Sequence, residues 1–122
     1  EITVFGNDYD TPDGSCIRDY IHVVDLAKAH ISALKYLNAQ SIGFYDVFNI
    51  GSGHGNSVFE IIHTFEKTTG LKVPYRIGKR RMGDVVATYA DCSKANKELG
   101  WHTVKSLEDA CRDSWNWQQK LK

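Results

Sequence analysis

RDYIHVVDLAKAH, the stretch from Arg18 to His30, decides the fold because the pattern of the chain changes from strand to helix within it. Every second residue of a strand shares one face, and over 16–22 that face carries Arg18, Tyr20 and His22. Over 23–37 the apolar residues recur at helical spacing, namely Leu26, Ala29, Ala33, Leu34 and Leu37. We therefore expect a strand over 16–22 that leads directly into an amphipathic helix.

Further strand and helix patterns lie on both sides of this stretch. Short apolar runs predict strands at 2–5, 45–50 and 73–77, with an extended stretch at 85–90. Ser57 followed by Glu60 forms a capping box and Gly70 is a typical helix end, so we expect a helix between them. Two more helical patterns cover 92–99 and 106–119. This order of elements predicts a small mixed α/β domain over residues 1–122.

The composition argues against several classes of protein. Fifteen basic and fifteen acidic side chains give a net charge of zero, so no overall field attracts nucleic acid or an anionic membrane. No apolar run is long enough to cross a membrane. The three cysteines are odd in number and lack the spacing of zinc ligands, which is typical of free thiols in a reducing compartment. We expect a cytoplasmic protein that binds neither nucleic acid nor membranes and holds no metal.

Two separate segments carry the candidate binding residues. Arg18 and Tyr20 share the polar face of the expected strand, and RRMGD at Arg80–Asp84 places two arginines beside a glycine and a carboxylate. Guanidinium groups bind phosphate oxygens through paired hydrogen bonds, and a carboxylate accepts hydrogen bonds from sugar hydroxyls. Arg18, Arg81 and Asp84 therefore favour a site for a nucleotide sugar. The alternative is a solvated strand face and a solvated charged loop.

Three other patterns carry less weight. Gly51–Gly55 follows an apolar run, but its glycines lack GxGxxG spacing, so we interpret it as a turn before a helix. Tyr75 and Lys79 match YxxxK, the catalytic pair of short-chain dehydrogenases. That pair works from a helix, whereas these two residues lie in a strand pattern where four residues span about 13 Å. The histidines and carboxylates show no ligand spacing typical of a metal site.

Five segments together resemble the C-terminal part of the UDP-galactose 4-epimerase (UDP-glucose 4-epimerase) family, whose members are extended short-chain dehydrogenases/reductases. The segments are VFGNDYDTPDGSCIRDYIHVVDLAKAH, FNIGSGHGNSVFEII, RRMGDVVATYAD, SKANKELGW and SLEDACRDSWNWQ, and they cover essentially the whole chain. The most specific is the DTPDG loop joined to CIRDYIHVVDLA. The corresponding domain of an NDP-sugar dehydratase or decarboxylase is one alternative, and a non-catalytic UDP-binding module is another.

The resemblance implies substrate-binding roles for eight positions. These are Thr3, Val4, Phe5, Arg18, Tyr20, Arg81, Asp84 and Thr88. Thr3, Val4 and Phe5 would line the uracil largely through backbone groups, and Arg18 and Arg81 would hold the diphosphate. Tyr20 would lie alongside the nucleotide, and Asp84 would bind the ribose. Thr88 stands where the family carries either Tyr or a small residue beside the sugar, so an N-acetylated UDP-sugar would also fit.

The resemblance also implies what this chain does not carry. In the family a larger N-terminal Rossmann domain binds NAD and supplies the catalytic Tyr and Lys, and the smaller domain packs on it. We therefore expect residues 1–122 to be the C-terminal UDP-sugar-binding fragment of a longer enzyme, with no catalytic or cofactor-binding residue and no activity alone. The intact enzyme would interconvert UDP-galactose and UDP-glucose and would be a homodimer.

Overall fold

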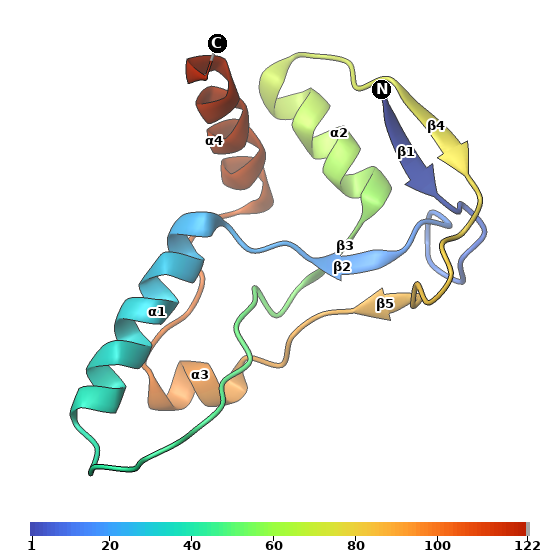
Figure 1. The fold of residues 1–122 in the computed structure, drawn as a ribbon. Helices are drawn as coiled ribbons and strands as arrows, with labels where there is room; N and C mark the ends of the chain where they lie inside the picture. Colours follow the sequence, from blue (N-terminus) through green and yellow to red (C-terminus); the bar gives the residue numbers. More distant parts are fainter. Residues whose placement is uncertain (122) are drawn as a thin grey trace.

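The computed structural model describes residues 1–121 and shows a mixed α/β domain, which confirms the expected fold class (Figure 1). In chain order the elements are β1 (Ile2–Phe5), β2 (Ile17–Asp19), α1 (Val23–Asn38), β3 (Gly55–Ser57), α2 (Val58–Thr69), β4 (Tyr75–Gly78), β5 (Ala87–Thr88), α3 (Ser93–Glu98) and α4 (Leu107–Lys120). Figure 1 shows α1 and α3 at one end and α2 and α4 at the other, with the strands between and beside them. No helix in the described part of the chain is both long and apolar enough to span a bilayer.

The strands form two small sheets. β1 and β4 pair in parallel, with Ile2 opposite Tyr75 and Phe5 opposite Gly78. β2 is the central strand of the other sheet, antiparallel to β3 and parallel to β5. The register of β2 and β5 places Arg18 opposite Thr88. Two candidate site residues that are far apart in the sequence therefore become neighbours.

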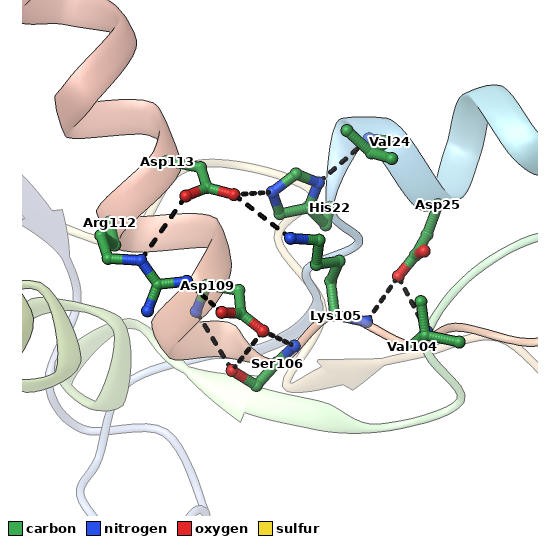
Figure 2. A network of polar contacts seen from close by, with 9 residues as sticks. All are labelled: His22, Val24, Asp25, Val104, Lys105, Ser106, Asp109, Arg112 and Asp113. Carbon is green, nitrogen blue, oxygen red and sulfur yellow. Dashed lines mark hydrogen bonds and ion pairs between the residues drawn. The ribbon is translucent and has the colours of Figure 1, made fainter.

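A small apolar core joins α1 to α3. Ala29, Ala95 and Trp101 are buried against one another. The Trp101 Nε1–H donates a hydrogen bond to the backbone carbonyl of Asp25 at 3.0 Å. The Asp25 side chain is fully buried, and its Oδ2 accepts hydrogen bonds from the N–H groups of Val104 at 3.0 Å and Lys105 at 2.9 Å (Figure 2). The loop after α3 is thus fastened to the first turn of α1.

α2 and α4 pack side by side, and each begins with a capping box. The expected box at Ser57 and Glu60 is present, and Gly70 ends α2 with a positive φ of 72°, which glycine adopts at little cost. Trp115 contacts Phe65 edge to face, with ring centroids 5.8 Å apart, whereas Trp117 is exposed. Trp115, rather than Trp117, therefore packs between the two helices.

A polar network joins the start of α1 to α4 (Figure 2). His22 is the N-cap of α1, and its Nδ1 accepts a hydrogen bond from the Val24 N–H at 3.0 Å. The ring proton therefore lies on Nε2, which is 3.2 Å from Asp113 Oδ2. Lys105 Nζ and Arg112 Nε lie 3.5 and 3.6 Å from the same carboxylate. This arrangement uses both nitrogens of His22 in helix capping and helix packing.

Two expectations from the sequence are wrong. The strand expected over 16–22 covers only Ile17–Asp19, and His22 is a buried helix cap rather than part of an exposed face with Arg18. The strand expected over 45–50 does not form within the described residues. A strand requires a neighbouring strand that shares its hydrogen bonds, and neither sheet extends to this segment. Its apolar pattern alone could not reveal that missing partner.

Candidate functional site

Three charged side chains from two distant segments meet beside β5. Arg81 Nε lies 2.9 Å from Asp84 Oδ2, and Arg81 Nη2 lies 3.3 Å from Asp84 Oδ1. Arg18 Nη2, from β2, lies 3.4 Å from the same Oδ1. The structure therefore brings Arg18, Arg81 and Asp84 into one cluster.

Backbone geometry and stacking hold this cluster in place. Arg18 Nη1 donates hydrogen bonds to the carbonyls of Ile17 at 2.7 Å and Val85 at 2.9 Å. The Arg81 guanidinium lies over the Phe5 ring, 4.7 Å from its centroid, which is a favourable cation–π contact. A turn brings Asp84 back to Arg81, since the Asp84 N–H donates to the Arg81 carbonyl at 3.2 Å. Both guanidinium groups are therefore held in place by neighbouring groups of the protein.

The electrostatics of the cluster favour the charged forms of Arg81 and Asp84. The hydrogen bond from Arg81, together with the charges of both arginines, lowers the pKa of Asp84, although partial desolvation opposes this. The same hydrogen bond raises the pKa of Arg81. Two guanidinium groups and one carboxylate leave one net positive charge, so the cluster favours an anionic ligand.

The free edge of β1 lies close to this cluster. The N–H groups of Ile2 and Gly6 donate to the carbonyls of Pro74 and Gly78 on the β4 side, each at 2.9 Å. Because backbone groups alternate between the two edges of a strand, the N–H and C=O groups of Thr3 and Phe5 point to the opposite edge. Val4 points its side chain inward and is 1% exposed. A flat ring with its own donors and acceptors could pair with the backbone of Thr3 and Phe5.

Thr88 lines a hollow of about 520 Å³ next to Arg18. The walls come from β2, β5 and the extended segment before the glycine loop. They comprise Arg18, Asp19, Phe48, Asn49, Ile50, Thr88, Tyr89, Ala90 and Asp91. A ligand bound at the arginines would therefore extend past Thr88 into a polar hollow.

Tyr20 follows β2 and lies half-buried between the cluster and the α2/α4 pair. It lines a second hollow together with Phe65 and Cys111. Burial raises the pKa of its hydroxyl, and the charge of Arg18 partly opposes this increase. Four of the eight candidate positions are joined by direct contacts, namely Phe5, Arg18, Arg81 and Asp84. Thr88 and Tyr20 line the two neighbouring hollows.

Asp19, to which no role was assigned from the sequence, organises the hollow. Its Oδ1 accepts hydrogen bonds from the Ser52 N–H at 2.8 Å and the Ser52 hydroxyl at 2.6 Å. Its Oδ2 accepts from the N–H groups of Gly53 at 3.1 Å and Ala90 at 3.2 Å. Burial tends to raise the pKa of Asp19, but these hydrogen bonds together lower it. The sequence feature that could have pointed to Asp19 is its position next to Arg18 within a strand.

The remaining sequence motifs have structural explanations. The glycine loop directs N–H groups of Ser52 and Gly53 to Asp19, so they are not free for a phosphate. Tyr75 lies in β4 rather than on a helix, and its ring packs edge to face on Phe59 of α2. Arg80 stacks over the Tyr9 ring at 4.1 Å and pairs with Asp8 at 2.7 Å. Within residues 1–121 no group of three His, Cys, Asp or Glu side chains is arranged to hold a metal ion.

The sequence of this chain matches a protein-family model and individual known proteins. A family model described as GDP-mannose 4,6 dehydratase matches residues 1–114. The UDP-glucose 4-epimerase of Bacillus subtilis is 51% identical over 119 residues, which are 97% of this chain and 34% of that protein. The chain therefore spans about a third of the length of such relatives.

Solved structures show the same relationship. A UDP-glucose 4-epimerase from Stenotrophomonas maltophila, crystallised with NAD and formylated UDP-arabinopyranose, superposes with a TM-score of 0.94 at 50% identity. That match covers 99% of this chain and 35% of the other. The Bifidobacterium longum enzyme in complex with NAD+ and UDP has a TM-score of 0.88 at 51% identity, covering 97% and 34%. The chain belongs to the family that the GDP-mannose 4,6 dehydratase model describes, an extended short-chain dehydrogenase/reductase family, and resembles its UDP-glucose 4-epimerases throughout.

Proposed function

We propose that residues 1–122 are the C-terminal UDP-sugar-binding part of a UDP-glucose 4-epimerase. The observation that carries the proposal is the cluster in which Arg18 and Arg81 converge on one carboxylate beside the free edge of β1. In this proposal the backbone groups of Thr3 and Phe5 pair with uracil and the arginines grip the diphosphate. Asp84 accepts from the ribose, Tyr20 flanks the nucleotide, and Thr88 faces the sugar.

The proposed division of labour follows from the chemistry of epimerisation. In this proposal the N-terminal part of the enzyme would hold NAD, which would supply the transfer of a hydride from sugar C4 and its return to the other face. The sugar must turn over between these two transfers while the UDP end stays fixed. Arg18 is suited to the fixed end because two carbonyl groups already hold its guanidinium. The residues of this chain thus supply positioning rather than bond chemistry.

We also propose that the N-terminal Rossmann domain packs on α1 and on the segment before the glycine loop. Outside the face that buries Ala29, α1 carries Ile31, Leu34 and Leu37, which are 54%, 60% and 50% exposed. The neighbouring extended segment exposes Tyr45 and Val47 as well. An apolar surface of this kind usually has a partner. The intact enzyme is proposed to be a homodimer, and the three free cysteines favour the cytoplasm.

The site is tested by titrating the 122-residue chain with UDP, UMP, GDP and inorganic phosphate, followed by NMR. We expect weak binding, with UDP ahead of UMP because two arginines contact the diphosphate, and ahead of GDP because β1 pairs with uracil. GDP binding ahead of UDP would instead favour the dehydratase alternative. Supplying the N-terminal part in trans, with NAD and UDP-galactose, should restore epimerase activity, and a soluble complex without activity would contradict the proposal.

Thr88 suggests a substrate range for the intact enzyme. Its side chain is small and exposed at the hollow beside Arg18, which leaves room for an N-acetyl group. We propose that UDP-GlcNAc and UDP-GalNAc are also interconverted. In the reassembled enzyme Thr88→Tyr should abolish turnover of the N-acetyl sugars and spare UDP-galactose, whereas equal retention of both activities would refute the idea.

A further inference from the structure

The Asp84 carboxylate lies between the two arginines. Its Oδ1 lies 3.3 Å from Arg81 Nη2 and 3.4 Å from Arg18 Nη2, so a single oxygen contacts both guanidinium groups. The Asp84 side chain is only 15% exposed. An incoming phosphate oxygen that bridges the two arginines must compete with this carboxylate.

The backbone fixes the carboxylate in this place. The turn closed by the Asp84 N–H and the Arg81 carbonyl includes Gly83 at a φ of 83°, a conformation that other residues rarely adopt. Arg18 is tethered to the carbonyls of Ile17 and Val85, and Arg81 is stacked on Phe5. Groups of the protein itself therefore hold the three charges together.

The effect of Asp84 depends on what the ligand offers. A bare diphosphate brings only negative oxygens, which the carboxylate repels at short range. A nucleoside diphosphate brings ribose hydroxyls as well, and these donate to a carboxylate that has been released from the arginines. The loss of the internal ion pairs is then offset by new hydrogen bonds.

From this geometry we infer that Asp84 is a specificity-determining residue that selects diphosphates carrying hydroxyl donors against inorganic pyrophosphate and similar bare polyanions. The inference rests on the proposed function, because it takes the arginine pair as the diphosphate site. It adds that the same carboxylate acts as a built-in competitor for the arginines.

The test compares Asp84→Asn with Asp8→Asn in the 122-residue chain, using pyrophosphate and UDP as probes in NMR titrations at low salt. Asn keeps one acceptor oxygen for Arg81 and removes the charge. Asp8 pairs with the adjacent Arg80, so Asp8→Asn removes the same charge nearby without touching the arginine pair. Asp84→Ser serves as a second uncharged variant, and circular dichroism checks that each variant is folded.

In Asp84→Asn we expect pyrophosphate to bind about tenfold more tightly, an effect that falls as salt is added, while the affinity for UDP changes less than about threefold. Asp8→Asn should change both affinities by less than about threefold. Equal tightening of pyrophosphate in both variants, or weaker binding of both ligands in Asp84→Asn, would overturn the inference. If UDP binds but its preference over pyrophosphate is the same in Asp84→Asn as in the wild type, the inference is overturned and the proposed function stays intact. Absence of binding by either ligand to the wild-type chain and both Asp84 variants would overturn both.

Discussion

Replacing Asp19 by Asn should loosen the hollow beside the arginine cluster. The wild-type carboxylate joins three segments, since two donors on Ser52 approach Oδ1 and the N–H groups of Gly53 and Ala90 approach Oδ2. Asn has the same size but only one acceptor oxygen. If the oxygen of the new Asn side chain faces Ser52, the amide NH2 group faces the N–H donors of Gly53 and Ala90, which lose their acceptor. In the opposite orientation the NH2 group faces the two donors of Ser52, and these lose their acceptor instead.

The expected loss is about 2 to 3 kcal/mol in the free energy of unfolding, because a donor left without its acceptor costs about 1 to 3 kcal/mol. The estimate lies below the sum for two fully buried donors because Gly53 is exposed and can bind water. The Ser52 hydroxyl can also rely on the His54 carbonyl, which lies 3.1 Å away. The urea midpoint should then fall by about 1 M.

The pH dependence has a defined sign. Asp19 has a lowered pKa in the folded chain, so its contribution to stability is present above the unfolded pKa of about 4 and is lost as the pH falls through the lower folded value. Asp19→Asn should therefore lose more stability at pH 7 than at pH 3. Urea unfolding at both pH values measures this difference.

Asp91→Asn is the matched control. Among the described residues, Asp91 accepts hydrogen bonds only from Ser93 within its own turn, so this variant should cost less than about 1 kcal/mol. The amide resonance of Ala90 should move in Asp19→Asn and far less in the control. Equal urea midpoints for the two variants, with the Ala90 resonance unmoved, would refute the claim that Asp19 joins these segments.

Two further predictions concern α4. Trp115→Ala should lower the free energy of unfolding by about 2 to 3 kcal/mol, because Trp115 is half-buried against Phe65. Trp117 is exposed, so Trp117→Ala should change it by less than about 0.5 kcal/mol. Urea unfolding measures both variants, and equal effects would contradict the packing. Hydrogen bonds from the Ser106 N–H and from Arg112 lower the pKa of Asp109 to about 2. The capping contribution of Asp109 should be intact above about pH 4 and lost as the pH falls through about 2, so helical circular dichroism should decline there in the wild type and be less acid-sensitive in Asp109→Asn.

Local signals predicted the helices well. The capping box at Ser57 and the glycine at Gly70 define α2, and both depend on neighbours within a few residues. The strands were less predictable because pairing involves distant segments. The expected strand over 45–50 has the right composition but no partner within the described residues, whereas the three-residue β3 forms because β2 lies beside it.

The candidate site shows the same division. Arg18, Arg81 and Asp84 were identifiable because guanidinium and carboxylate groups have specific chemistry with phosphates and ribose. Their convergence on one oxygen was not, because it depends on the pairing of β2 with β5 and on the turn at Gly83. Asp19 was missed for a related reason, since three of its four donors belong to backbone N–H groups that any sequence would supply.

The sequence by itself determined the helices, their caps, the family resemblance and the residue types able to hold a nucleotide sugar, because these follow from short-range geometry and side-chain chemistry. Only the tertiary structure decided that His22 caps α1 and that the Asp84 carboxylate lies between Arg18 and Arg81. Which atoms meet depends on how distant strands pair, and a local pattern does not contain that pairing.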